Sequence, residues 1–125
     1  MLTDTHCHLF YPDLKKDITQ VLQRADALGV TKFICVGTNL DDSDECLKLA
    51  EEHDAIYATA GIHPHDAKDA PDDFLKQLSD FLLHDKMVAV GEIGLDYFRN
   101  ISEPDIQKSV FRSQLELAKS MDLPI

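Results

Sequence analysis

The sequence predicts an α/β domain built on a parallel β-sheet. Short apolar runs rich in β-branched residues alternate with segments of helical period, and four such pairs follow one another along the 125 residues. Glycine and polar residues directly follow the second, third and fourth apolar runs. Strands separated by helices require parallel crossovers, which leaves two folds open: a doubly wound open sheet and a (β/α)8 barrel. Periodicity alone does not choose between them.

The first strand and helix pair has the clearest boundaries. An apolar run covers residues 2–9, and apolar side chains then recur at helical spacing from Leu14 to Leu28. Asp13 is a candidate N-cap for this helix, and Gly29 follows its end, where a left-handed residue is common. The pattern therefore predicts one helix with an apolar stripe that faces the core.

Three further pairs repeat this pattern at intervals of roughly 30 residues. Pro71 and Pro104 precede the third and fourth helices, a position that suits proline. Residues 122–125 fall where a fifth strand would begin. A complete barrel needs about 250 residues, so we expect the chain to supply one domain that is about half of such a fold. The expected strands and helices are 31–36 with 43–53, 55–60 with 74–82, and 87–90 with 106–121.

Composition narrows the class of protein. No apolar run approaches the roughly 20 residues that span a bilayer, and no signal segment is visible, so we predict a cytoplasmic protein. The three cysteines form no Cys-x-x-Cys unit, which predicts reduced thiols. The net charge of −11 disfavours non-specific binding along a nucleic-acid backbone. Any phosphate must therefore be held locally, and bound cations are one means of doing so.

Two histidines and one glutamate are the strongest candidates for chemistry. His6 and His8 alternate with Cys7 on the first strand, so both imidazoles point to the same side. Glu92 follows the fourth strand. Because the carboxyl ends of the strands meet at one edge in βα folds, these side chains are expected to converge on a divalent metal ion. The alternative is an exposed His-x-His pair that binds nothing.

Other polar residues follow the same strand ends. His63 and His65 flank Pro64, and His63, nearer the strand, is the better candidate for substrate contact; either ring could instead cap a carbonyl. In the fourth loop Arg99 could meet a phosphate and a neighbouring aromatic could stack on a base, or the cluster could simply pack the loop. Asp4 could orient a ligand histidine or hold the strand start. Three glycines are expected to let strands turn into loops without strain: Gly37, Gly61 and Gly91.

Three motifs together carry a family resemblance. Residues 3–9 (TDTHCHL), 61–65 (GIHPH) and 91–97 (GEIGLDY) resemble the TatD-type metal-dependent hydrolases, a deoxyribonuclease family within the amidohydrolase-like barrels. The motifs stand in family order and cover the whole chain. The resemblance implies a (β/α)8 barrel of TIM-barrel type, of which residues 1–125 form the N-terminal half with about the first four βα units.

The resemblance also implies a two-metal centre that hydrolyses phosphodiester bonds in DNA. In the matching positions His6 and His8 bind one ion, Glu92 bridges both ions, and His63 lies near the substrate phosphate. Glu92 and His63 are therefore the expected catalytic residues, and the divalent ions are Zn²⁺, Mg²⁺ or Mn²⁺. The family completes its centre with two histidines and an aspartate from later strands, so the resemblance implies that residues 1–125 carry only part of the metal shell and leaves the activity of this part alone open.

We therefore predict a deoxyribonuclease in which two ions, roughly 3.5 to 4 Å apart, lower the pKa of water and stabilise the leaving oxygen. The acidic surface favours strand ends or short single strands of DNA as the substrate. One alternative keeps the centre but changes the substrate to another ester or amide, such as an aminoacyl ester of tRNA. Another treats the chain as a non-catalytic fragment or binding module that self-associates or needs its missing half.

Overall fold

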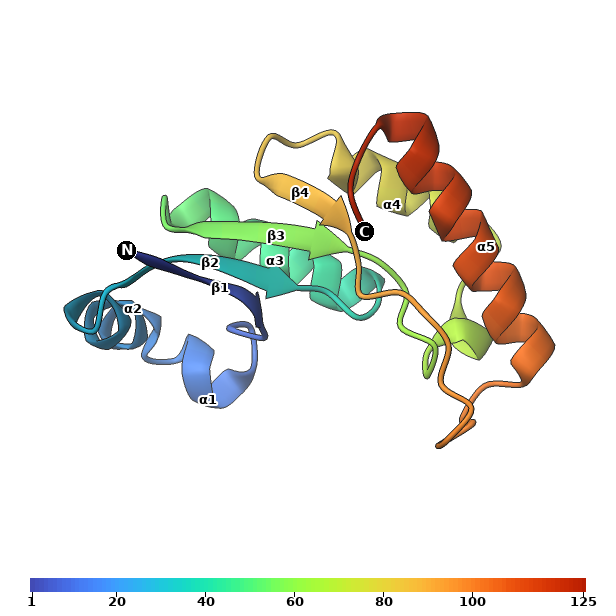
Figure 1. Cartoon of the computed structure of the whole chain (residues 1–125), viewed down its shortest axis with the longest axis horizontal. Coiled ribbons are helices and arrows are strands. Elements are labelled where there is room, and N and C mark those ends of the chain that lie inside the picture. The colour runs from blue at the N-terminus through green and yellow to red at the C-terminus, as the bar shows by residue number, and fades with distance from the viewer.

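A four-stranded parallel sheet forms the centre of the molecule, as a computed structural model of residues 1–125 shows (Figure 1). Each strand pairs in parallel with its neighbour in the chain. A doubly wound sheet reverses its strand order at a switch point, whereas this sheet runs β1-β2-β3-β4 without reversal, as a barrel does. The strands are β1 (Leu2–Cys7), β2 (Val30–Val36), β3 (Ile56–Ala60) and β4 (Met87–Val90).

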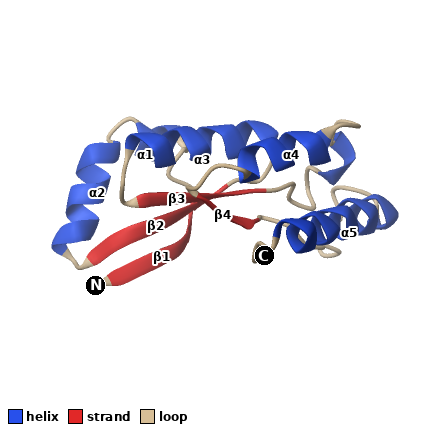
Figure 2. Cartoon of the chain, turned by 90° about the horizontal axis from the view of Figure 1, so that it is seen from above, coloured by secondary structure: helices blue, strands red, loops and turns tan.

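The helices lie on one side of this sheet. Figure 2 shows α3 and α4 along one face of the strands, with no element over the opposite face of β1, β2 and β3. No helix is both long and apolar enough to cross a membrane. The helices are α1 (Pro12–Lys15), α2 (Ile18–Ala27), α3 (Leu40–Glu52), α4 (Phe74–Leu82) and α5 (Pro104–Met121), with a 3-10 turn, η1 (Ala67–Asp69).

The hydrophobic core fills the space between the sheet and its helices. Alternate residues of β2 and β3 point into it, and α3 and α4 cover them from outside. Cys35 of β2 and Cys46 of α3 meet there with their sulfur atoms 3.3 Å apart, and both remain free thiols. The most deeply buried apolar members are Cys35, Cys46, Leu49, Ala50, Ile56, Ala58, Ala60, Leu78 and Val90.

The prediction of one continuous first helix is wrong. It is two helices, α1 and α2, and Asp13 lies inside the first turn of α1 rather than at its N-cap, which is Tyr11. Gly29 is confirmed as the residue past the helix end, with a φ of +85°. The expected burial is only partial, because Leu28 is 82% exposed and no residue of α2 is fully buried.

The other boundaries differ from expectation by a few residues. Helix α3 begins at Leu40, earlier than predicted, because the Asn39 side chain accepts the main-chain N–H of Asp42 at 2.9 Å and caps the helix. Helix α4 and strand β4 match the prediction, while β1 ends at Cys7. On α5 the apolar Ile106, where the predicted helix begins, is exposed, and the neighbouring polar Gln107 is buried.

The uncovered face of the sheet is concave and mainly apolar. A cavity of about 630 Å³ lies over it. The main-chain N–H of Val90 donates to the carbonyl of Pro124 at 2.9 Å, which places the residues after α5 beside β4, where a fifth strand is expected. The apolar residues that line this face come from β2, β4, the loop after β4, α5 and the residues after α5: Ile34, Val36, Val88, Ala89, Val90, Ile93, Phe111, Pro124 and Ile125.

Candidate metal centre

The three predicted ligands meet at the carboxyl ends of the strands. One ligand atom from each of His6, His8 and Glu92 lies within 4.8 Å of the other two. Nε2 of His6 is 3.4 Å from one carboxylate oxygen of Glu92, although β1 and β4 are at opposite edges of the sheet. The curvature of the sheet therefore brings together residues that are 86 positions apart in the sequence.

His8 is oriented by a single hydrogen bond to the neighbouring strand. Its Nδ1 lies 2.9 Å from the carbonyl oxygen of Val36, and because a carbonyl oxygen only accepts, Nδ1 carries the ring proton. Nε2 is then left with its lone pair free. The Tyr11 ring stacks on the imidazole at a centroid distance of 5.4 Å and fixes its plane. This arrangement of a histidine held by a carbonyl is typical of metal ligands.

Glu92 is positioned by contacts with β3 and with the residue that follows β2. Its N–H donates to the carbonyl of Gly37 at 2.7 Å, and the Thr59 hydroxyl donates to the carbonyl of Gly91 at 2.7 Å. A Cβ on Gly61 would lie 2.7 Å from the carbonyl carbon of Gly91, so glycine is needed there for close approach of two chains. The φ of Gly61 is not positive, so the need for glycine at this position comes from the close approach to Gly91 and not from a left-handed backbone.

His63 faces Glu92 from the opposite side to His6. Its Nε2 is 3.6 Å from the second carboxylate oxygen, and its Nδ1 accepts the main-chain N–H of His65 at 3.1 Å. In the neutral ring the proton is therefore on Nε2, which points toward Glu92. Burial lowers the pKa of His63, against the opposing attraction of Glu92, and so favours this neutral form.

The structure decides the role of Asp4 and places two other histidines away from the candidate ligands. Asp4 accepts the main-chain N–H of His6 at 3.1 Å, so it supports the strand rather than an imidazole ring. His53 caps the end of α3 and His84 pairs with Glu51 at 3.3 Å, both outside the pocket that holds the candidate ligands.

Sequence reasoning missed two buried glutamines that hold the loops of the site. Gln114 on α5 accepts the N–H of Ile62 at 2.7 Å and donates to its carbonyl at 3.1 Å, next to His63. Gln107 on the same helix binds the main chain of Asp96. The two glutamines are seven residues apart and so share one helix face, a signal that the apolar pattern of α5 obscured.

The donor set suits a divalent metal ion. Neither carboxylate oxygen of Glu92 accepts a protein hydrogen bond, and Nε2 of His6 and of His8 donates none. Three side chains thus present nitrogen and oxygen ligand atoms that make no protein hydrogen bond, and these atoms converge at the wall of a polar pocket of about 650 Å³. Two imidazoles and a carboxylate with an open side are ligands that Zn²⁺ and similar ions take at catalytic sites.

A half-barrel of parallel βα units, with metal-ligand side chains at the carboxyl ends of its strands, is typical of the metal-dependent hydrolases. Comparison with known proteins specifies the family: the TatD related DNase family matches residues 3–125, and the chain belongs to it. The family resemblance seen in the sequence motifs is thereby confirmed.

Two curated relatives illustrate the similarity. An uncharacterized metal-dependent hydrolase, YabD, of Bacillus subtilis is 42% identical over 125 residues, which are 100% of this chain and 49% of the relative. The 3'-5' ssDNA/RNA exonuclease TatD of Pectobacterium carotovorum is 37% identical over 98% of this chain and 47% of its own length. The chain therefore spans about half the length of the curated relatives that it matches.

Solved structures confirm the predicted fold class. The TatD homolog YjjV of Escherichia coli superposes with a TM-score of 0.91 and 40% identity, over 98% of this chain and 48% of the other. A TatD family hydrolase of Entamoeba histolytica gives a TM-score of 0.87 and 26% identity, over 95% and 46%. The chain has the fold of the N-terminal half of a TIM barrel.

Proposed function

We propose that residues 1–125 form the N-terminal half of a metal-dependent hydrolase that cleaves phosphodiester bonds in single-stranded nucleic acid, DNA in particular. The main support is the convergence of His6, His8 and Glu92 within 4.8 Å at the rim of the half-barrel. The similarity to a relative named as a 3'-5' ssDNA/RNA exonuclease supports the substrate class. The later strands of the whole protein supply the remaining ligands.

His6, His8 and Glu92 are the proposed metal ligands in this half. The two carboxylate oxygens of Glu92 face opposite sides, one toward His6 and the other toward His63, which suits a carboxylate that bridges two ions. We infer two divalent ions, Zn²⁺, Mg²⁺ or Mn²⁺, in the complete centre. When bound, such ions polarise a phosphoryl oxygen and make water an effective nucleophile at neutral pH.

His63 is the proposed catalytic residue that contacts the substrate. Its Nε2 proton points into the pocket beside Glu92, so it can donate to a phosphate oxygen. The bond from the His65 main chain to Nδ1 holds the ring in this tautomer, and the bond from His63 N–H to the Thr38 carbonyl, at 2.7 Å, fixes its main chain. His63 therefore stabilises negative charge on the substrate without changing its own protonation state.

The net charge of the chain favours one form of nucleic acid as the proposed substrate. With 12 basic and 23 acidic residues, it lacks the basic surface that would track along a duplex. Short single strands and strand ends need few phosphate contacts, and the pocket of about 650 Å³ is open enough to admit one end. A cytoplasmic location is proposed from composition alone.

Parallel metal and activity measurements on the full-length protein test this proposal. His6→Ala and Glu92→Gln are expected to lower bound metal and to reduce cleavage of an end-labelled oligodeoxynucleotide by at least about a hundredfold. His84→Ala is the matched control, because this histidine also pairs with a carboxylate but lies outside the pocket. Unchanged metal content in both site variants would contradict the proposed centre.

The choice of substrate is tested on the same preparation. The oligodeoxynucleotide is assayed beside a cyclic amide and an aminoacyl ester, with Mg²⁺, Mn²⁺ or Zn²⁺ added. We expect cleavage of the oligonucleotide. Cleavage of the other two compounds alone would replace the nuclease with a hydrolase of other esters or amides, with the metal ligands unchanged.

A further inference from the structure

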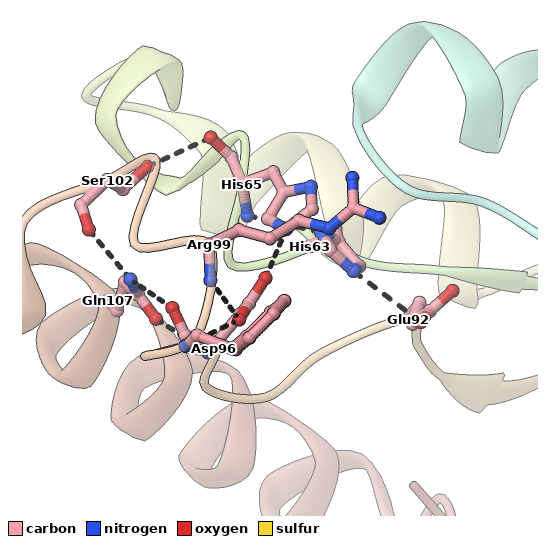
Figure 3. Close-up of polar contacts among 8 residues, drawn as sticks. His63, His65, Glu92, Asp96, Arg99, Ser102 and Gln107 are labelled. Atoms are coloured by element: carbon pink, nitrogen blue, oxygen red, sulfur yellow. Dashed lines mark hydrogen bonds and ion pairs between the residues drawn. The ribbon is translucent and has the colours of Figure 1, made fainter.

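The loop after Glu92 presents a positive charge to the candidate site. Among the 14 residues that line the polar pocket, Arg99 is the only lysine or arginine. No hydrogen bond or ion pair in the structure engages its guanidinium; only its main-chain N–H is bonded. Figure 3 shows the Arg99 side chain extending across His63 toward the side of the pocket where Glu92 lies. In a protein of net charge −11, an unpaired guanidinium in this position is a candidate anion contact.

Asp96 fixes the main chain of this loop. One of its carboxylate oxygens accepts the N–H groups of Phe98 and Arg99, each at 3.0 Å, and the other bonds to Nε2 of His65. These bonds hold the pKa of Asp96 below its ordinary value, and the bond from the Arg99 main chain contributes most. The carboxylate is therefore charged at neutral pH. Both carboxylate oxygens of Asp96 are engaged by other groups, and neither pairs with the Arg99 guanidinium.

Two buried polar side chains, Gln107 and Ser102, hold the loop of Asp96 in place. Gln107, 1% exposed, accepts the N–H of Asp96 at 2.8 Å and donates to the carbonyls of Asp96 and Ser102 at 3.1 and 2.7 Å. The hydroxyl of the fully buried Ser102 donates to the carbonyl of His65 at 2.9 Å. Figure 3 shows these contacts as one network that joins the loop of Arg99 to the loop of His63 and His65. The base of Arg99 is thus rigid, while its charged end is free for a ligand.

We propose that Arg99 binds the phosphate next to the scissile one in a single-stranded substrate, and that Asp96 is the residue that positions it. This inference rests on the proposed function, since the proposed function places the scissile phosphate between Glu92 and His63. Arg99 enters the same pocket from the neighbouring loop, so it reaches one phosphate further along the strand. A guanidinium can bind a phosphate through two parallel hydrogen bonds, which gives strength and direction.

The test compares substrates with and without a neighbouring phosphate. In the full-length protein, kcat and KM are measured for a short oligothymidylate and for bis(p-nitrophenyl) phosphate, which contains a single phosphodiester. Arg99→Ala is expected to raise KM for the oligonucleotide about tenfold with little change in kcat, the size of one lost charge-assisted hydrogen bond. Its effect on KM for the one-phosphate substrate should be several times smaller.

Salt dependence separates a phosphate contact from a structural role. For a single strand, the loss of one phosphate contact should reduce the slope of log KM against log salt by about 0.7. Arg99→Lys should retain that slope but recover only part of the affinity. Arg112→Ala is the matched control, because it removes the same charge from an exposed site on α5 outside the pocket. Asp96→Ala should behave as Arg99→Ala, and Asp96→Asn, which keeps an oxygen for both N–H groups, should restore KM.

Failure of this inference can be told apart from failure of the proposed function. Equilibrium binding of the labelled oligothymidylate, measured by fluorescence anisotropy with EDTA present, does not depend on cleavage. A tenfold weaker Kd in Arg99→Ala supports the phosphate contact even if the wild type cleaves nothing, an outcome that would refute only the nuclease. An Arg99→Ala variant with the Kd and salt slope of Arg112→Ala would overturn the contact, whatever the activity.

Discussion

Gln114 provides a direct test of how the site is held in place. Its carboxamide is fully buried and makes two hydrogen bonds to Ile62, which is 52 residues away in the sequence. Gln114→Leu keeps the size of the side chain but leaves the N–H and the carbonyl of Ile62 buried without partners. At about 1.5 kcal/mol for each unsatisfied group, the free energy of unfolding should fall by about 3 kcal/mol.

Urea titration of the full-length protein, followed by circular dichroism, measures this loss. The midpoint should fall while the slope stays constant, because the surface exposed on unfolding is nearly unchanged. Arg112→Ala, on the exposed side of the same helix, should change the free energy of unfolding by less than about 0.5 kcal/mol. A loss below about 1 kcal/mol in Gln114→Leu would refute the reasoning, because the loop would then have satisfied its groups in another way.

Three further predictions concern the packing, the charges and the open face. Gly61→Ala places a Cβ 2.7 Å from the Gly91 carbonyl carbon, so it should cost about 2 kcal/mol of stability and weaken metal binding by displacing Glu92, as calorimetry would show. The Asp96 pKa is lowered in the folded state, so its contribution to stability is present above its unfolded pKa and lost as pH falls through the folded value. The melting temperature of the wild type should therefore approach that of Asp96→Asn as pH falls below about 4. Residues 1–125 expressed alone should form higher-order species in light scattering, because β1 is exposed and the concave face is apolar.

Each of these three predictions has an outcome that would contradict it. In Gly91→Ala the added Cβ comes no closer than 3.7 Å to any atom, so an equal loss in this variant would remove the close-approach argument. A constant difference in melting temperature across acid pH would show that the Asp96 carboxylate is not stabilised in the folded state. A monomer of residues 1–125 that melts cooperatively would contradict the expected self-association and favour a self-sufficient open sheet.

Local periodicity predicted most of the secondary structure. Strand β4 and helix α4 have the expected bounds, because in both segments the apolar pattern coincides with the residues that are buried. The division between α1 and α2 was missed, since both segments continue one apolar spacing. The burial of Gln107 was also missed, because a polar side chain is buried only where a distant main chain offers it partners.

The sequence by itself determined the alternation of strands and helices, the three motifs and the chemical types of the candidate ligands, because these depend on neighbours along the chain. The tertiary structure decided which of them meet. The curvature of the sheet brings His6 and Glu92 to 3.4 Å from opposite edges, and a hydrogen bond to Val36, 28 residues away in the chain, fixes the tautomer of His8. The loop that carries Arg99 likewise depends on the bond between Asp96 and His65, 31 residues away in the chain. Such contacts join residues far apart in the chain, so no local pattern encodes them.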